Sequence, residues 1–531
     1  MAKRYSLLIS DKNWRGLSFL LFGALFLLIL CTFLHYGLTW DEEHSKINGE
    51  IALHWYASGF ADPSQLTTFN YHLYGSFFNL LARFAAAVSP LGFYETSHFL
   101  IALFGLLTVF GVYRIGTRIA GPMGGFFSAL FLALTPVFYG HSFNNPKDIP
   151  LTALFVLSLD CMLGLYESLP KPTRALLIRL GVLIGLTLGV RVGGLILFGY
   201  LAVLCLGWLG ARRQLSLKKG IALVQPLLWV LAIGWGVMLV FWPYAELSPL
   251  LNPFRALSES THFAWNLTVF FEGQYISAMQ LPWRYLPTWF AIQLPEFYFI
   301  SLAAGIFLGF RFLKQKNFSL KKRDQLIQIA FLCFAFVFPL SVAIIFKSTV
   351  YDGMRHFLFV LPVLTLLAGV SLAKTFKSGI PLQCKQVVAA LVAGSLILTV
   401  VDMVQLHPYE YVYFNRLVAG GLAKASERFE TDYWGDSYKE GLEWVAKNYH
   451  PVANGKIRIA NCRNSSRFMT GYPIEQDPTL RERFVAVNPE DQPNVLLAIT
   501  RWGCSKTPGR VLHVVERQNT PLLYVIETKA P

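Results

Sequence analysis

The sequence predicts a polytopic helical membrane protein, mainly α, with a small α/β domain at its C-terminal end. Of the 531 residues, 54% are hydrophobic and only 15% are charged, whereas soluble domains carry about 25% charge. Apolar runs of about 20 residues, the length that crosses a bilayer as a helix, recur up to residue 404. A polar region without such runs begins at His407. These observations predict a transmembrane domain over residues 1–406 and a second domain over residues 407–531.

About eleven apolar segments are candidate membrane spans. They cover residues 16–36, 98–113, 124–139, 149–166, 175–190, 192–209, 221–242, 297–312, 328–346, 356–373 and 386–404. Residues 71–91 are apolar too, but Asn79 and Arg83 interrupt them. We therefore expect that segment to form a helix along the membrane interface.

The basic residues of the short loops predict the orientation in the membrane. Cytoplasmic loops collect Lys and Arg, and alternate loops of this chain do so. These loops hold Arg114, Arg118, Lys171, Arg174, Arg212, Lys374 and Lys377. The net charge of +15 therefore reflects topology, and we expect no nucleic-acid partner. We predict a multi-pass protein of the bacterial inner (plasma) membrane, with a cytoplasmic N-terminus and a retained first span.

The C-terminal region has the pattern of a small α/β domain on the periplasmic or extracytoplasmic face. "SYKEGLEWVAKNY" has helical spacing, and "KIRIA", "NVLLAIT", "RVLHVVE" and "PLLYVIE" are predicted strands between turn residues. Cys462 and Cys504 would lie in an oxidising compartment, where they could pair.

Sequence motifs for soluble cofactors are not found. The chain has no Gly-rich phosphate loop, no nucleotide fingerprint and no metal-type spacing of Cys and His. We expect no cofactor and no metal ion. If the protein is an enzyme, it would therefore take its activated donor from the membrane itself.

The first candidate site is "TWDEEHS", where the first span leaves the membrane. It holds Asp41, Glu42 and Glu43 beside aromatic residues. Partial burial at the membrane surface is expected to raise the pKa of a carboxyl group and to make it a better general base. For any one of the three, a solvated surface carboxylate is the simpler explanation.

The second candidate site is "HSFNNPKDIP", at the mouth of a later span. Asp148 is a candidate catalytic carboxylate, although it could equally be a helix cap ahead of Pro150. Lys147 is a cation on the side of the membrane that is normally poor in cations.

Further cations lie at span mouths on the same predicted side. They are Arg191, Lys347, Arg355 and His356. With Lys147, they predict a binding site for the phosphate of a lipid-linked donor. The alternative for each is an ordinary surface ion pair or a side chain that reaches to the interface.

The arrangement resembles the polytopic C-type glycosyltransferases. "WDEE", "HSFNNPKDIP", "YDGMRHFLFVLP" and "HPYEYVYFNRLVAGG…DYWGDSYKEGLEWV" are similar to segments of a bacterial branch of glycosyltransferase family 39. That family includes protein O-mannosyltransferases, and aminoarabinose transferases that modify lipid A are similar. The resemblance covers most of the chain.

The resemblance implies a hexosyl- or pentosyltransferase with a polyprenyl-phosphate sugar as donor and inversion at the anomeric carbon. Asp41 then falls on the catalytic acidic position, with Glu42 beside it and Asp148 in the second acidic loop. Because Lys147 precedes Asp148 where a metal-binding pair would have two carboxylates, we expect a metal-independent reaction. The acceptor (protein, lipid or polysaccharide) is left open. The lipid tail would lie between spans, bordered by the segments "FYETSHF" and "WRYLPTWF".

Other classes of function stay open from the sequence. A flippase or transporter of lipid-linked sugars would also use cations and a groove, but it has little use for the Asp41–Glu42 pair. A polysaccharide polymerase or ligase would differ mainly in its acceptor. A structural envelope protein would tolerate the loss of Asp41.

Overall fold

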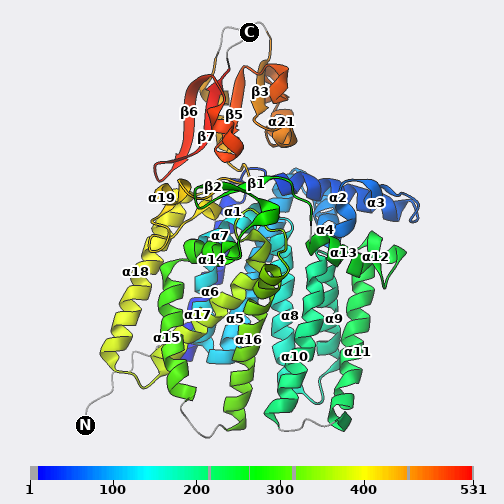
Figure 1. The fold of residues 1–531 in the computed structure, drawn as a ribbon, viewed down its shortest axis with the longest axis vertical. Coiled ribbons are helices and arrows are strands. Elements are labelled where there is room, and N and C mark those ends of the chain that lie inside the picture. Colours follow the sequence, from blue (N-terminus) through cyan, green and yellow to red (C-terminus); the bar gives the residue numbers. More distant parts are fainter. Residues whose placement is uncertain (1–9, 213–216, 262, 314–318, 451–454, 529–531) are drawn as a thin grey trace.

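The chain folds into a helical bundle with a β-sheet at one end. The computed structural model describes residues 10–212, 217–261, 263–313, 319–450 and 455–528. Figure 1 shows the long helices side by side, with the sheet beyond one end of them. We call this end the sheet end, and the opposite end, where Arg118, Arg212 and Lys377 lie, the basic end. The predicted cytoplasmic N-terminus, residues 1–9, lies outside the described residues.

The helices confirm the predicted fold class of a multi-pass membrane protein. Eight helical segments of the described chain are long and apolar enough to cross a membrane, and two bent pairs raise the number to ten. The eight are α1 (Asp11–Thr32), α5 (Phe93–Ala120), α8 (Asp148–Ser168), η2 (Val192–Leu195) with α10 (Ile196–Ala211), α11 (Leu217–Val240), α16 (Leu320–Ile345), η4 (Arg355–Val360) with α17 (Leu361–Lys377), and α18 (Leu382–Leu406).

Helix α9 (Arg174–Leu188) accounts for the difference from the eleven predicted spans. It has 15 residues, about 22 Å of helix, which is shorter than a hydrocarbon core of about 30 Å. It nevertheless packs along α8 and α11. The sequence pattern places this helix within two residues of its observed ends, but 15 residues are too few to count as a full span.

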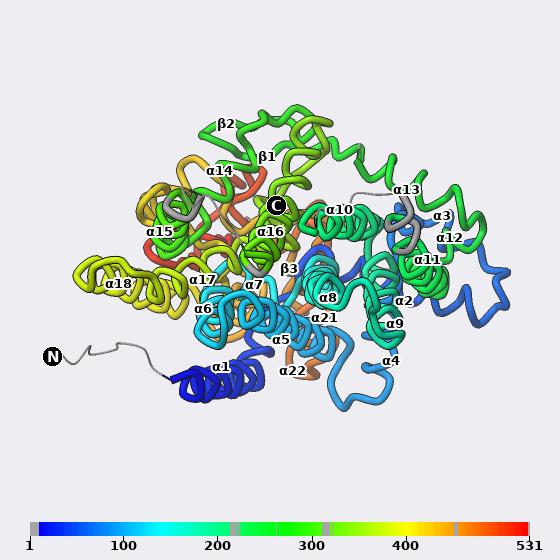
Figure 2. The backbone as a smooth tube through the Cα atoms, turned by 90° about the horizontal axis from the view of Figure 1, so that it is seen from below, coloured from blue at the N-terminus to red at the C-terminus, as the bar shows by residue number. Residues whose placement is uncertain are grey.

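Helices α8 and α17 form the centre of the bundle. In the span of α8, 89% of the residues are buried, compared with 17% in α1. Figure 2, seen from the basic end, shows α1 and α18 at the edge. Small residues allow close packing at the centre: a methyl group added to Gly369 of α17 would meet the backbone nitrogen of Ser128 in α6 (Pro122–Ala133) at 2.5 Å.

The basic loops gather at one end of the bundle, as the charge pattern predicts. Ion pairs and hydrogen bonds join them there: Arg114 Nε to Asp160 (2.7 Å), Arg212 Nη1 to Asp324 (3.1 Å) and Lys377 Nζ to the carbonyl of Ala120 (2.8 Å). These contacts hold the helix ends in place at the end remote from the sheet.

Two proline-containing breaks bend the chain within the bundle. Helices α6 (Pro122–Ala133) and α7 (Pro136–Asn144) meet at 67°, and α14 (Tyr285–Gln293) and α15 (Glu296–Leu313) meet at 105°. Pro136 and Pro295 lie at these breaks. Proline has no N–H to donate and disfavours helical backbone in the residue before it. The first bend directs α7 toward the loop that carries Lys147.

Short helices lie across the sheet end of the bundle (Figure 1). They are α2 (Trp40–Ala57), α3 (Ser64–Thr67), η1 (Tyr71–Leu73), α4 (Phe77–Val88), α12 (Pro243–Leu247) and α13 (Asn252–Thr261). Helix α4 has 12 residues, about 18 Å, which is too short to cross a bilayer. The sequence predicts one interfacial helix over residues 71–91, and the structure forms η1 and α4 there, separated by a short break.

A five-stranded sheet forms the end of the chain. Its strands are β3 (Ile457–Asn461), β4 (Phe484–Val487), β5 (Val495–Ile499), β6 (Arg510–Arg517) and β7 (Thr520–Glu527), in the order β4-β3-β5-β7-β6. Strands β4, β3 and β5 are parallel, and β7 is antiparallel to β5 and β6. Helices α20 (Tyr438–Asn448) and α21 (Arg467–Gln476) pack on it, and α22 (Pro478–Arg483) precedes β4.

The helix and four strands predicted in the C-terminal region are present. Three other strands were not predicted: one in this region, and two in a hairpin earlier in the chain. Strand β4 and the hairpin of β1 (Thr268–Phe271) and β2 (Gln274–Ser277) have four residues each. Four residues are too few for an alternating pattern to stand out from its surroundings.

The segment between α18 and α20 is built into the end of the bundle. It contains η5 (Glu410–Val412) and α19 (Leu422–Ser426), and η5 packs against α7. Tyr411, Tyr433 and Trp434 are fully buried, and Asn144 Nδ2 donates to Asp436 Oδ2 at 3.2 Å. The predicted domain boundary at residue 407 stays a prediction.

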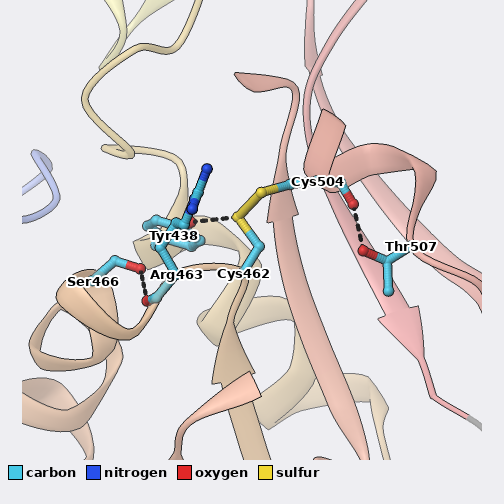
Figure 3. The surroundings of a disulfide bond; sticks show 6 residues. All are labelled: Tyr438, Cys462, Arg463, Ser466, Cys504 and Thr507. Carbon is cyan, nitrogen blue, oxygen red and sulfur yellow. Dashed lines mark hydrogen bonds between the residues drawn. A yellow bond between two sulfur atoms is a disulfide. The ribbon is translucent and has the colours of Figure 1, made fainter. Parts of the chain in front are cut away.

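Cys462 and Cys504 form a disulfide, with their Cα atoms 5.9 Å apart. It joins the end of β3 to the turn η8 (Arg501–Lys506). Figure 3 shows Tyr438 beside the bond, within 3.4 Å of Cys462 Sγ. The predicted option of pairing is thus the one that the structure adopts.

We expect Cys504→Ser to destabilise the sheet region. The bond closes a loop with a sequence separation of 42. Loss of such a cross-link lowers the free energy of unfolding by about 4 kcal/mol, because the unfolded chain gains conformational entropy. Limited proteolysis of purified protein should cut the C-terminal region faster in the variant, and reducing agent should have the same effect on the wild type. Cys384→Ser, at an exposed free thiol, is the control. Equal cleavage of all three proteins would contradict the expectation.

Candidate functional site

The three carboxylates of "WDEE" lie in the first turn of α2 and contact three different sets of partners. The start of a helix stabilises negative charge, which explains why they are compatible with this position. Their partners are Lys147 and Arg355 for Asp41, Thr39 and His98 for Glu42, and Tyr94 for Glu43. The sequence groups them, but the structure separates their roles.

Asp41 is held between two cations. It is 9% exposed. Its Oδ1 lies 2.9 Å from Lys147 Nζ, and its Oδ2 lies 2.7 Å from Arg355 Nη1. Burial alone would raise the pKa of Asp41, but Lys147 and Arg355 outweigh it and hold the pKa well below its usual range. The expected raised pKa is therefore wrong for Asp41, because burial of the carboxylate also brings the cations into contact with it.

Glu42 has a structural position at the start of α2. Its Oε2 accepts from the backbone N–H of Thr39 at 2.8 Å, which completes a capping box with the Thr39 side chain. Its Oε1 lies 2.7 Å from His98 Nε2. Burial raises the pKa of Glu42, against the opposing effect of His98. Glu42 therefore contacts Thr39 and His98, whereas Asp41 contacts Lys147 and Arg355.

Asp148 shares one cation, Arg355, with Asp41. It is the first residue of α8, and its backbone N–H donates to Asn145 Oδ1 at 2.8 Å. Its Oδ1 lies 3.2 Å from Arg191 Nη1 and its Oδ2 lies 3.8 Å from Arg355 Nη1. The structure thus brings Asp41, Lys147, Asp148, Arg191 and Arg355 together, and we call these five residues the acid–cation cluster.

An apolar groove of about 580 Å³ opens beside this cluster. Arg191 lines its polar end with Tyr74, and their backbones pair as a β-bridge. Lys147 Nζ lies 5.0 Å from the centre of the Tyr74 ring. Apolar side chains of η2, α10 and α16 form another part of its lining, including Leu195, Ile196, Phe338 and Val342.

His356 and Lys347 have different positions relative to the cluster. His356 lines the groove and packs edge-on against Tyr351, with the ring centres 4.6 Å apart. Lys347 is exposed and lines another cavity with Trp283. The structure therefore does not bring Lys347 to the other predicted phosphate-binding residues.

The aromatic segments predicted to border the lipid tail also lie elsewhere. "FYETSHF" begins α5, where Tyr94 packs against Tyr472 at 4.7 Å between ring centres. "WRYLPTWF" lies at the cavity with Lys347. Neither segment lines the groove beside the acid–cation cluster, and their place beside a lipid tail stays a prediction.

A chain of buried ion pairs continues from Arg355 into the C-terminal region. Arg355 is 4% exposed, and its Nε donates to Asp352 Oδ2 at 3.0 Å. Asp352 Oδ1 lies 2.6 Å from Arg501 Nη2, and Arg501 Nε lies 3.0 Å from Glu430 Oε1. Asp41 is therefore connected to Glu430 through Arg355, Asp352 and Arg501.

Sequence reasoning missed Asp352, Arg501 and Glu430. Asp352 and Gly353 both have positive φ, 56° and 69°, so "YDGM" is a tight turn whose Gly gave a detectable signal. Arg501 and Glu430 lie in ordinary polar surroundings in the sequence. Only the fold shows that they are buried against the bundle.

The fold and the site define a multi-pass membrane protein with a buried acid–cation cluster beside an apolar groove. Residues 77–240 match the family model of dolichyl-phosphate-mannose-protein mannosyltransferases. Over these residues, the match confirms the predicted resemblance to glycosyltransferase family 39. The matched part includes Lys147, Asp148 and Arg191, but not Asp41 or Arg355.

The chain also matches solved structures at low sequence identity. ArnT from Cupriavidus metallidurans in the apo state has 16% identity and a TM-score of 0.48, covering 96% of this chain and 97% of that chain. The ArnT structure bound to undecaprenyl phosphate has 16% identity and a TM-score of 0.49, and the match covers 95% of this chain and 97% of that chain. The Archaeoglobus fulgidus oligosaccharyltransferase tethered with an acceptor peptide has 14% identity and a TM-score of 0.48. The match covers 86% of this chain and 60% of that chain. No curated protein sequence matches the chain.

The ionisation of Glu430 predicts a pH dependence of stability. Burial raises the pKa of Glu430 to about 7, against the effect of Arg501. Because the folded pKa is raised, the stabilisation is complete below the unfolded pKa of about 4.5 and is lost as the pH rises toward 7. We expect Glu430→Gln to remove this dependence, which amounts to about 3 kcal/mol. Thermal unfolding of both proteins from pH 4.5 to 8 measures it, and parallel curves would contradict the expectation.

Proposed function

We propose that the protein is a membrane glycosyltransferase that moves a sugar from a polyprenyl-phosphate donor to an acceptor hydroxyl. The observation that carries this proposal is Asp41, held between Lys147 and Arg355 beside an apolar groove with Arg191 at its polar end. A proton acceptor, cations for a leaving phosphate and a channel for a lipid are the three parts that such a reaction needs. The family model matched by residues 77–240 is named for a dolichyl-phosphate donor, which supports this class of substrate.

The donor would bind with its phosphate at the acid–cation cluster and its tail in the groove. Arg191 Nε is buried and has no hydrogen-bond partner among the described residues, so it can donate to a phosphate oxygen. Lys147 adds a compact charge next to it. The apolar walls from α10 and α16 suit a polyprenyl chain, which favours burial in proportion to its apolar area.

Asp41 would accept the proton of the acceptor hydroxyl. In this step the hydroxyl oxygen bonds to the anomeric carbon, the bond from that carbon to the phosphate oxygen breaks, and the phosphate leaves with the electron pair. A donor phosphate competes with Asp41 for Lys147 and Arg355. These cations lower the pKa of Asp41. When they also contact the donor phosphate, their effect on Asp41 weakens, and its pKa rises toward the range of a useful base.

The same geometry supports direct, metal-independent transfer with inversion. Asp148 is the orienting group, since it contacts Arg191 and Arg355 at 3.2 and 3.8 Å. Positive side chains occupy the positions around both carboxylates, so the charge of a leaving phosphate is balanced by protein groups. His356 borders the groove near the phosphate position. Glu42 acts through the start of α2, which positions Asp41.

We further propose that transfer takes place on the outer face of the bacterial inner membrane. The loops at the basic end carry Lys and Arg, as cytoplasmic loops do, and the cluster lies toward the sheet end. The region from His407 onward would then be periplasmic or extracytoplasmic, with the acceptor (protein, lipid or polysaccharide) approaching from that side.

Asp41→Asn is expected to reduce sugar transfer by at least about 100-fold, the usual lower range for the loss of a general base. Cells lacking the chromosomal copy would be complemented with the wild type, with Asp41→Asn or with Glu50→Gln, an acid on the same helix with a partly exposed ion pair to Arg83. Mass spectrometry of polyprenyl-linked sugars should show one species that accumulates only with Asp41→Asn. Identical profiles at equal protein levels would remove Asp41 from catalysis and favour transport of the lipid-linked sugar.

Arg191→Gln is expected to weaken the binding of undecaprenyl phosphate by about tenfold, because a charge-assisted contact to phosphate is lost. Titration of the purified protein with this lipid measures the effect. Arg284→Gln is the matched control, since Arg284 pairs with Glu272 at the surface. Equal affinity of all three proteins would place the phosphate elsewhere.

A further inference from the structure

Another, smaller cavity lies between the C-terminal region and the β1–β2 hairpin, apart from the acid–cation cluster. Its volume is about 250 Å³, equal to about eight water molecules of the liquid. It is bordered by the β1–β2 hairpin, the segment before α20, the turn after β5 and strand β7. It shares no lining residue with the groove between α10 and α16.

The wall of this cavity combines buried charges with aromatic rings. Glu430 is 7% exposed and pairs with Arg501. The hydroxyl groups of Thr431 and Thr500 lie 3.2 Å apart. The aromatic side chains that line it include Tyr275, Trp502 and Tyr524. This mixture of rings and a few fixed polar groups is typical of sites for small polar ligands.

Two polar atoms of the wall lack partners. Glu430 Oε2 and Trp502 Nε1 are buried and have no hydrogen-bond partner among the described residues. Buried polar atoms without a partner are costly, so each calls for a ligand or another explanation. One atom accepts and the other donates. A hydroxyl group can do both, so a ligand with several hydroxyl groups satisfies both atoms.

The charges of the wall argue against an ionic ligand. Glu430 and Asp432 disfavour an anion, and Arg501 disfavours a cation. A neutral ring with several hydroxyl groups avoids both penalties and can pack its C–H face on the aromatic side chains. A sugar ring has these properties, whereas a lipid tail does not.

The cavity is coupled to the proposed reaction centre. Arg501 contacts Glu430 on one side and Asp352 on the other, at 3.0 and 2.6 Å. Asp352 holds Arg355, which holds Asp41. The disulfide at Cys504 fixes the turn that carries Arg501 and Trp502. A ligand that binds Glu430 can therefore reposition groups that contact Asp41.

We propose that this cavity binds a neutral sugar ring of the acceptor. This inference rests on the proposed glycosyltransferase function and assigns the acceptor to the carbohydrates or glycolipids. The sugar of the donor is a less suitable occupant, because it is bonded directly to the phosphate and must lie at the acid–cation cluster.

Binding of methyl glycosides of common hexoses to the purified full-length protein tests the proposal. Saturation-transfer NMR should detect at least one glycoside with the wild type. Glu430→Gln and Trp502→Phe should each weaken it by about tenfold, the effect of one strong hydrogen bond. Trp502→Phe removes the indole N–H and keeps an aromatic ring. Trp444→Phe is the control, because Trp444 stacks on His513 elsewhere on the sheet region.

Parallel titrations with undecaprenyl phosphate distinguish the two proposals. If this lipid binds and no glycoside does, or if the two cavity variants bind glycosides like the wild type, the sugar site is overturned while the proposed function stands. If the lipid does not bind either, the proposed function fails. Glycoside binding should persist when the protein is saturated with undecaprenyl-phosphate mannose. Displacement by this donor would assign the cavity to the donor sugar and overturn the assignment to the acceptor.

Discussion

The buried guanidinium of Arg355 is the interaction on which the site depends. It contacts Asp41 of α2 and Asp352 of the preceding turn, and lies 3.8 Å from Asp148 at the start of α8. A buried charge is costly unless it is paired, and removal of one partner costs about 3 to 5 kcal/mol. These segments can therefore not move apart independently. The contacts of Arg355 fix the positions of Asp41 and Asp148 at the sheet end of the bundle.

The site combines two environments that a lipid-linked substrate requires. Polar groups from α2, the loop before α8 and Arg191 meet at one end of a groove whose other wall is apolar. An amphipathic donor fits this junction in one orientation only, because either part would lose favourable contacts if reversed. Under the proposed function, the junction would therefore favour a phosphate attached to a long apolar chain.

The C-terminal region is part of the site and not only an attached domain. Arg501 of the sheet region contacts Asp352 and the carbonyl of Tyr433. The segment before α20 places buried aromatic rings over the cluster, and Arg355 lies 5.2 Å from the centre of the Trp434 ring. These contacts exclude water from the ion pairs and strengthen them. They also form the route by which the proposed acceptor sugar would influence Asp41.

The sequence by itself determined the class of fold, the basic end of the bundle and four of the five sheet strands, because hydropathy and charge are local properties. It also identified every member of the acid–cation cluster, since acids and cations at span mouths are unusual. Only the tertiary structure decided that Glu42 caps a helix, that Lys347 lies apart, and that Asp352, Arg501 and Glu430 extend the site. Pairing between distant residues depends on how helices pack. The same packing reversed the expected pKa shift of Asp41, because burial brought two cations with it.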